Sequence, residues 1–373
     1  MKYNLSDICD YVRGKVDVAS LIYENYISTE NMISNKGGIT SASSLPSVAQ
    51  TQSFQVGDIL VSNIRPYFKK IWFAEFNGGC SNDVLVLRAK DSISKKFLYY
   101  VLTDDTFFNY SMLTSKGTKM PRGDKAAIMK YEVPGFTYKE QEKIAKILEA
   151  FDKKIQLNSN INDNLLEQAL TLYKKYFPYN VDDEFPNGWR IGTVGEIIEI
   201  HDSKRIPLSS AERMKMTRKI YPYYGAASLM DYVDDFIFNG KYLLLGEDGT
   251  VVDSSGYPIL QYVCGKFWVN NHTHILTGKL GFNVESLYML FKQTPVKSIV
   301  TGAVQPKISQ TNLRSIRVVI PPKKLLKDYN CLVDPLFSLF RLNKEENKSL
   351  ATLRDTLLPK LMSGEIDVSS VKI

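Results

Sequence analysis

The sequence lacks the features that would place it in a membrane or outside the cell. No apolar run approaches the roughly 18 residues that a membrane-spanning helix needs, and residues 1–15 contain no apolar stretch followed by a small-residue cleavage site. The chain has only four cysteines, which are far apart and form no CxxC pair: Cys9, Cys80, Cys264 and Cys331. We therefore expect a cytoplasmic protein with free thiols and no membrane contact.

Most motifs of catalysis are also missing. There is no GxxxxGK[ST] phosphate loop, which argues against an ATP-driven motor. An adenine methyltransferase needs an Asp/Asn-Pro-Pro-aromatic loop, and the nearest match, Asp334–Phe337, lacks the second proline and lies in a helical segment. The stretch Leu243–Gly249 could be a cofactor loop, but a strand followed by a hairpin turn is the simpler interpretation. We expect a non-catalytic chain without a cofactor.

Only three histidines are present, so a metal site of three histidines is hard to build. His272 and His274 flank Thr273 at strand spacing and are expected to share one face. A metal pair is one interpretation, and hydrogen-bonded or DNA-facing histidines are the favoured one. The string Asp152–Lys154 has the composition of a nuclease site, but in a helical segment it is more typical of a solvated face. We predict no metal.

The net charge of +7 and the pI of about 8.9 suit a nucleic-acid partner. No segment is a polybasic tail, because acidic residues accompany the basic ones throughout the chain. A DNA-binding surface would therefore have to be gathered by folding.

The chain repeats itself once. Residues 139–177 and 324–362 are both rich in Lys, Glu, Leu and Asn, and each contains a seam of apolar residues at alternating steps of four and three. The two seams correspond at an offset of 185 positions: Ile144, Leu148, Phe151, Ile155, Asn158, Asn162, Leu165, Ala169, Leu172 and Tyr176, and then Tyr329, Val333, Leu336, Phe340, Asn343, Asn347, Leu350, Arg354, Leu357 and Leu361. This rhythm predicts two long helices that pair as a coiled coil, the first about 50 Å long.

Paired asparagines recur in the two seams and are typical devices for setting register. We predict antiparallel helices, with Asn158 near Asn347 and Asn162 near Asn343. The alternative is that both segments are amphipathic surface helices on a globular core.

The segments before each helix also correspond, so the duplication includes the globular parts. The turn Ser81–Asp83 matches Asn270–His272, and the loop Gly117–Arg122 matches Gly302–Lys307, each ending in proline plus a basic residue. Further correspondences are Gly57–Leu60 with Gly240–Leu243, and Leu98-Tyr99 with Leu287-Tyr288 as helix starts. The runs VLVLRA, KYLLLG, GKFWV and HILTG predict strands.

We therefore predict an α+β protein in which two mixed α/β domains alternate with two long antiparallel helices, as an internal duplication with approximate twofold symmetry. The expected boundaries are residues 1–137 for the first domain, 138–178 for the first helix, 179–322 for the second domain and 323–373 for the second helix and tail.

Three stretches resemble the specificity subunits of type I restriction-modification enzymes. Tyr138–Leu148 is similar to the family's EQxxIAxIL helix start, and Leu353–Ile366 resembles its LRxxLLPKLxSGEI ending. Pro186–Trp189 together with Val194–Ile197 is similar to the family's domain opening. The resemblance extends over nearly the whole chain.

The resemblance implies that each globular domain is a target-recognition domain reading one half of a split sequence in double-stranded DNA, with the helices as a ruler between the halves. It also implies two docked methyltransferase subunits, which carry S-adenosylmethionine and methylate adenine, and restriction/translocase subunits in the full complex. Two alternatives stay open: a non-catalytic coiled-coil adaptor that joins proteins, and a fused restriction-enzyme fragment with residual catalysis.

DNA contacts are expected from basic loop residues, which bind phosphates or read base edges. The candidates are Lys36, Arg65, Lys69, Lys70, Lys116, Lys119, Arg122 and Lys125 in the first domain and Lys204, Arg205, Arg213, Lys215, Arg218, Lys219 and Lys307 in the second.

Overall fold

The computed structural model describes residues 2–302, 304–369 and 371. The chain forms two compact units, each containing one globular domain and parts of both long helices. Unit 1 comprises residues 1–156 and 347–373, and unit 2 comprises residues 157–346. Among the described residues, no helix combines the length and apolar character needed to span a membrane.

Unit 1 contains two four-stranded sheets. One has the order β2 (Cys9–Tyr11), β9 (Val84–Ala89), β6 (Ile59–Ser62), β7 (Ile71–Phe73), and the other has the order β3 (Lys15–Asp17), β5 (Gln50–Phe54), β8 (Gly78–Cys80), β4 (Tyr26–Ile27). A separate pair joins β1 (Lys2–Asn4) to β10 (Glu132–Pro134). The helices are α1 (Leu5–Ile8), α2 (Lys95–Thr103), α3 (Asp105–Leu113) and α4 (Lys125–Ile128), and η1 (Val18–Ser20) and η2 (Pro66–Phe68) are single 3₁₀ turns.

Unit 2 is built around one six-stranded sheet. Its order is β12 (Ile198–Ile200), β17 (Thr273–Gly278), β15 (Phe238–Gly246), β16 (Leu260–Val269), β13 (Tyr221–Tyr224), β14 (Leu229–Val233). A separate pair joins β11 (Arg190–Thr193) to β18 (Arg317–Ile320). The shorter helices are α6 (Val194–Ile197), α7 (Ser210–Met214), α8 (Val284–Phe291) and α9 (Gln310–Ser315), with 3₁₀ turns η3 (Asp202–Lys204) and η4 (Lys297–Ile299).

The two units repeat the same order of elements. In each, a terminal strand pair leads through a one-turn helix closed by a capping box, Asn4 with Asp7 in α1 and Thr193 with Glu196 in α6, into an edge strand. The strand orders β2-β9-β6 and β12-β17-β15 then correspond, and α2 and α8 follow β9 and β17. The predicted mixed α/β domains are confirmed, and so are the four strand runs, which lie in β9, β15, β16 and β17.

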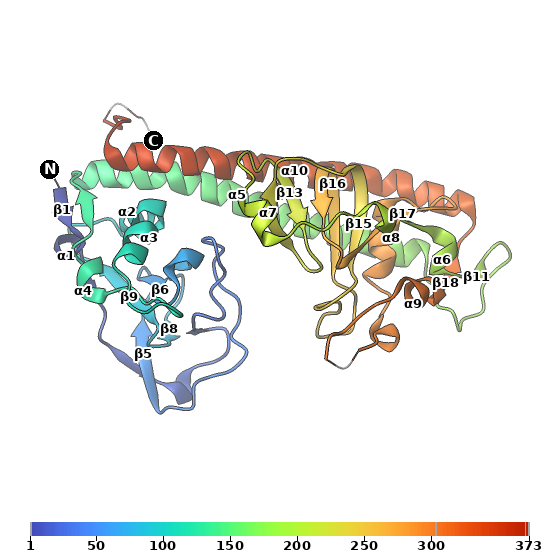
Figure 1. Cartoon of the computed structure of the whole chain (residues 1–373), viewed down its shortest axis with the longest axis horizontal. Helices are drawn as coiled ribbons and strands as arrows, with labels where there is room; N and C mark the ends of the chain where they lie inside the picture. The colour runs from blue at the N-terminus through green and yellow to red at the C-terminus, as the bar shows by residue number, and fades with distance from the viewer. Residues whose placement is uncertain (1, 303, 370, 372–373) are drawn as a thin grey trace. The chain divides into compact units, whose positions relative to one another are not determined.

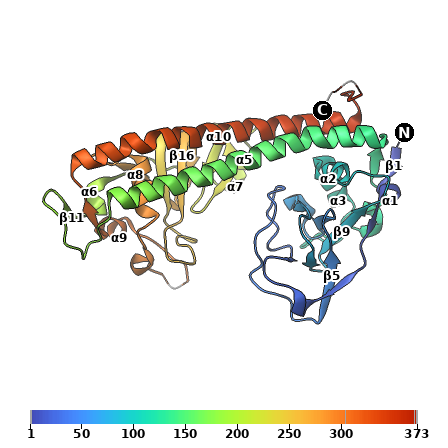
Figure 2. The same cartoon turned by 180° about the vertical axis from the view of Figure 1, so that it is seen from behind.

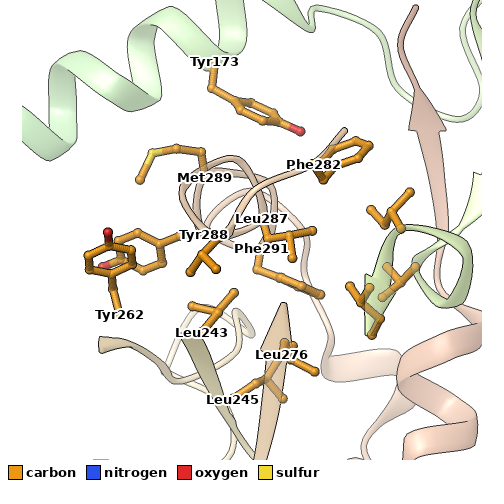
Figure 3. Packing of buried hydrophobic residues seen from close by; sticks show 14 of the residues in the cluster. Tyr173, Leu243, Leu245, Tyr262, Leu276, Phe282, Leu287, Tyr288, Met289 and Phe291 are labelled. Atoms are coloured by element: carbon orange, nitrogen blue, oxygen red, sulfur yellow. The ribbon is translucent and has the colours of Figure 1, made fainter. Parts of the chain in front are cut away.

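The core of unit 2 lies between its sheet and the long helices. α8 presents Leu287 and Phe291 toward Leu243 of β15 and Leu276 of β17, while Tyr173 reaches in from a long helix on the other side (Figure 3). All five side chains are almost fully buried, and burying each such group stabilises the fold by about 2 kcal/mol. The domain and the long helices of this unit therefore share one core.

The two long helices are α5 (Tyr138–Tyr176) and α10 (Lys323–Ser363). They lie side by side in each unit (Figures 1 and 2), and they are antiparallel, because Asp152 contacts Arg354 in unit 1 and Asn162 contacts Asn343 in unit 2. All twenty predicted seam residues are buried or half-buried, as a heptad seam requires.

The asparagines of the seam form hydrogen bonds between the two helices. Asn343 donates to Asn162 at 3.0 Å, as predicted. Asn158 donates to Glu346 at 2.7 Å, and Asn347 donates to the carbonyl of Ile155 at 3.2 Å. The expected closeness of Asn158 and Asn347 stays a prediction.

The sequence-based starts of two short helices differ from the structure by three residues. α2 begins at Lys95 and not at Leu98, because Ser94 caps it through a hydrogen bond from the Phe97 N–H. α8 begins at Val284 and not at Leu287, because Asn283 caps it in the same way. Asp334–Phe337 lies inside α10, so it is no base-holding loop.

Candidate nucleic-acid interface

In unit 1, three loops meet at what we call junction 1: residues 63–65, residue 83 and residues 116–123. Ile64 pairs with Arg122 in an antiparallel bridge, and the Arg65 N–H donates to the Pro121 carbonyl at 2.8 Å. Arg122 also exchanges two backbone hydrogen bonds of 2.9 Å with Lys116. The Asn63 N–H, finally, donates to the carbonyl of Asp83 at 2.8 Å, so all three loops are tied by their backbones.

Unit 2 contains the same arrangement at what we call junction 2: residues 247–249, residue 272 and residues 301–308, of which Ala303 lies outside the described residues. Asp248 pairs with Lys307, the Gly249 N–H donates to the Pro306 carbonyl at 3.0 Å, and Lys307 pairs with Thr301. The Glu247 N–H donates to the His272 carbonyl at 2.8 Å. The loop resemblance noted in the sequence is therefore a shared backbone geometry.

The basic residues at junction 1 are held by nearby carboxylates. Arg122 lies 3.2 Å from Asp83, and Lys36 and Lys69 both bind Asp105, at 2.9 and 2.8 Å. Burial raises the pKa of Asp105, but the hydrogen bonds from Lys69 and Lys36 outweigh it and leave that pKa below its usual value. The three cations are thus fixed in place.

Junction 2 has the same balance of charge. Lys307 lies 3.3 Å from Glu247 and 3.6 Å from Asp248, and these carboxylates raise the pKa of Lys307, chiefly through the hydrogen bond with Glu247. His272 is half-exposed and contacts Asp248 at 3.4 Å. A basic side chain follows the proline in both units, and each has an acidic partner close by.

Beneath junction 2 lies a buried charged group of four residues: Asp202, Arg205, Glu247 and His274. Asp202 accepts from Nδ1 of His274 at 2.6 Å, while Nε2 of His274 faces the carbonyl of Ile308 at 2.8 Å. Both ring nitrogens of His274 therefore face oxygen atoms. Burial raises the pKa of Asp202, but its hydrogen bond to His274 and the positive charges nearby lower it further than burial raises it.

This group contains the donor atoms of a three-ligand metal site, because Asp202, Glu247 and His274 offer ligand atoms within 4.8 Å of one another. Arg205, however, already binds Glu247 at 2.6 Å and lies 3.6 Å from Asp202. A guanidinium therefore supplies the positive charge that the carboxylates need. His272 precedes β17 and contacts Asp248, whereas His274 lies within β17 and contacts Asp202, so the two histidines have different partners, and their common face stays a prediction.

The predicted DNA-contacting residues differ in how free they are. Arg205 and Arg213 are largely buried, with side chains 14% and 12% exposed, and their guanidiniums bind Glu247 and Asp231. Lys70 donates to the Thr29 carbonyl, Lys116 binds Asp124, Arg218 contacts the Asp234 carbonyl and Lys219 contacts Asp231. Within the described residues, the candidates whose side chains have no hydrogen-bond or ionic partner are Arg65, Lys119, Lys125, Lys204 and Lys215.

Most of the candidates form one group in unit 1 and two groups in unit 2. Lys36, Arg65, Lys69, Lys116 and Arg122 lie in or against junction 1. In unit 2, Lys307 lies at junction 2 with Arg205 beneath it, whereas the segment around α7 carries a separate group: Arg213, Lys215, Arg218 and Lys219.

Sequence reasoning missed the acidic partners of these cations. Asp83 gave a partial signal, because the turn Ser81–Asp83 matches Asn270–His272 in the repeat, whereas Asp248 takes the place of Ile64 and gave none. Asp105 had no such signal, because it reaches Lys36 and Lys69 only through the fold.

Comparison with known proteins bears on this arrangement. A sequence model described as the type I restriction modification DNA specificity domain matches residues 1–167 and again residues 186–352. The type I restriction enzyme MjaIX specificity subunit of Methanocaldococcus jannaschii is 25% identical over 320 residues, which cover 76% of this chain and 71% of that protein. The HindI specificity subunit of Haemophilus influenzae is 21% identical over 98% of this chain and 99% of its own.

A solved structure shares the fold. The S subunit of a type I restriction-modification system from M. genitalium superposes with a TM-score of 0.55 at 20% identity, covering 97% of this chain and 96% of the other. Because the family model matches both halves of the repeat, the duplication inferred from the seams and loops is also a duplication of a known domain. The chain belongs to the family of type I restriction modification DNA specificity domains and carries two copies of that domain.

Proposed function

We propose that this chain is the specificity subunit of a type I restriction-modification enzyme, which binds a split target in double-stranded DNA and performs no chemistry itself. The observation that carries the proposal is the repeated junction: two domains of one DNA specificity family present the same three-loop geometry with a basic residue after proline. Two similar but non-identical loop sets suit a target with two different halves.

The long helices supply the second part of the proposal. Each unit contains antiparallel stretches of α5 and α10 with a continuous seam, which supports an antiparallel coiled coil that sets the spacing between the two half-targets. The alternative of a protein-joining adaptor explains the helices equally well, but it gives no role to the repeated basic loops.

Partner subunits would bind the outer face of the helices. In unit 2, α10 exposes three leucines at spacings of seven and three, Leu332, Leu339 and Leu342, with exposed fractions of 47%, 43% and 67%. Apolar side chains in such a row favour a protein partner over water. We propose docked methyltransferase subunits as these partners, and restriction/translocase subunits in the full complex, in the cytoplasm.

Methylation mapping tests the function. The chain alone should transfer no methyl group from S-adenosylmethionine, and its complex with a methyltransferase subunit should methylate adenines within one split sequence. A seven-residue insertion in both helices, after Gln156 and after Glu346, should lengthen the unread spacer by about three base pairs, because seven helical residues span about 10 Å.

Insertion in one helix alone is the control, since it breaks the seam and should abolish methylation. An unchanged spacer with retained activity in the double insertion would exclude the helices as the ruler. Methylation without any sequence preference in the wild-type complex would exclude the specificity function itself.

Replacing Arg122 or Lys307 by alanine should weaken DNA binding and flatten the salt dependence of the binding constant by about one unit each. The reason is that each side chain stands at a junction with its charge half-exposed, 56% for Arg122 and 45% for Lys307. Binding is measured on the assembled complex across a series of salt concentrations. Lys2→Ala, which removes an exposed ion pair with Glu132 at the β1–β10 strand pair, is the matched control; an unchanged slope in both junction variants would remove these residues from the interface.

A further inference from the structure

The two junctions carry different residues at one corresponding position, an arginine in unit 1 and a glycine in unit 2. Arg65 and Gly249 occupy the same place, since each donates its N–H to the carbonyl of the proline before the basic residue. Both have left-handed backbone conformations, with φ of +50° at Arg65 and +89° at Gly249. A Cβ added at Gly249 would meet no atom within 4 Å, so space does not require glycine at this position. The left-handed backbone conformation is what favours it.

Unit 1 therefore places an arginine where the backbone favours glycine. A non-glycine residue seldom adopts the left-handed region, because its Cβ crowds the following carbonyl oxygen, and such strain persists mainly at functional sites. Within the described residues, six non-glycine residues have positive φ, and four of them meet here: Asn35, Lys36, Arg65 and Lys69. The N–H groups of Asn35 and Lys36 donate to the carbonyls of Phe68 and Lys69, so two strained loops brace each other.

Arg65 also differs from its neighbours in its side chain. Lys36 and Lys69 form ion pairs with Asp105, and Arg122 forms one with Asp83. The half-buried guanidinium of Arg65 has no such partner within the described residues, and its Nε is buried without a hydrogen bond. The arginine is thus held by a braced backbone with its donors unused.

We propose that Arg65 is a specificity-determining residue that reads a guanine in the half-target of the first domain. Arginine donates two parallel hydrogen bonds to O6 and N7 of guanine in the major groove, and this is the commonest specific contact of proteins with DNA. A contact that reads a base needs a side chain fixed in position, which the braced loops provide, whereas a phosphate contact does not. This inference rests on the proposed function.

The test uses the complex of the full chain with a methyltransferase subunit. Arg65→Gly relieves the backbone strain and removes the donors, so unit 1 should be as stable as the wild type or more stable. Binding to the wild-type target, as identified by methylation mapping, should weaken by about 10- to 100-fold. Discrimination at one guanine of the first half should disappear, while the second half is read as before.

Two further variants separate base reading from other roles. Leu280→Gly relieves a similar strain at φ +54° in a loop of unit 2 that belongs to neither junction, and it should leave binding and discrimination unchanged. Arg65→Lys keeps the charge but not the planar pair of donors, so it should lose the discrimination as well. Each variant is tested by competition with duplexes in which one base pair of the target is changed in turn.

Uniform weakening by Arg65→Gly, with all base preferences kept, would mean a phosphate contact and would overturn the inference. Unchanged binding would overturn it too. Failure of the proposed function looks different, because the wild-type complex would then already lack sequence preference.

Discussion

Replacing Asp202 by asparagine is expected to destabilise unit 2 by about 3–5 kcal/mol, the usual effect of breaking a buried ion pair from one side. Asp202 is only 6% exposed, and its two oxygens accept hydrogen bonds from the Ile275 N–H, from His274 and from Gln310. Asparagine would turn an amide donor toward these donors and remove the negative charge that faces Arg205 and Nδ1 of His274. Denaturant unfolding, followed by a probe of unit 2, measures the loss.

The pH dependence gives a second observable for the same carboxylate. The pKa of Asp202 is lowered in the folded chain, so its stabilising contribution is present above the ordinary value near 3.8 and is lost as pH falls through the lowered value. The wild type should therefore lose part of its stability below about pH 4, and the asparagine variant should lose less. Asp231→Asn, which breaks a more exposed pair with Arg213 and Lys219, is the control and should cost about 1 kcal/mol or less; an equal loss in both variants would contradict the prediction.

Replacing Glu285 by alanine is expected to cost unit 2 a similar amount, about 3–5 kcal/mol, for a different reason. Glu285 is fully buried on α8, and its Oε1 accepts from Lys241 and Tyr262 at 2.7 Å each and from Arg341 of α10 at 3.2 Å. Burial raises the pKa of Glu285, but the hydrogen bonds from Lys241 and Tyr262 outweigh it and lower that pKa. Alanine would leave two cations facing each other without their anion.

A variant that removes all three charges separates this explanation from simple loss of packing. In Lys241→Met, Glu285→Leu, Arg341→Met the apolar volume is kept and no ion is left unpaired, so most of the stability should return. Thermal unfolding of the single and triple variants makes the comparison. If the triple variant is as unstable as Glu285→Ala, the charges are not the cause.

The long helices and their antiparallel pairing could be predicted because a seam depends only on residues close in sequence and on side-chain spacing. The register of the helix pair could be predicted as well, because aligning the two seams places Asn162 beside Asn343, which form a hydrogen bond. The strand Val84–Ala89 was equally readable from its β-branched and leucine run.

The candidate site could be located only to its loops. The proline-plus-basic loops were visible as a repeat, and Arg122 and Lys307 do occupy the same bridge position. The partners of these residues were not visible, because Asp202 and His274 are 72 positions apart and meet only when η3 packs against β17. Nor does any local signal tell that Arg65 is left-handed, since the contact that accompanies this conformation, from its N–H to the Pro121 carbonyl, joins residues far apart in sequence.

Unit 1 is formed from two separate stretches of chain, and this affects the order in which the domains fold during synthesis. Its core contains Leu358, Leu361, Met362 and Val368 packed with residues of the first 148 positions, whereas unit 2 is a single continuous stretch of chain. During synthesis the second domain can close on itself while the first still waits for the last helix to leave the ribosome. The domain translated first is therefore the one completed last.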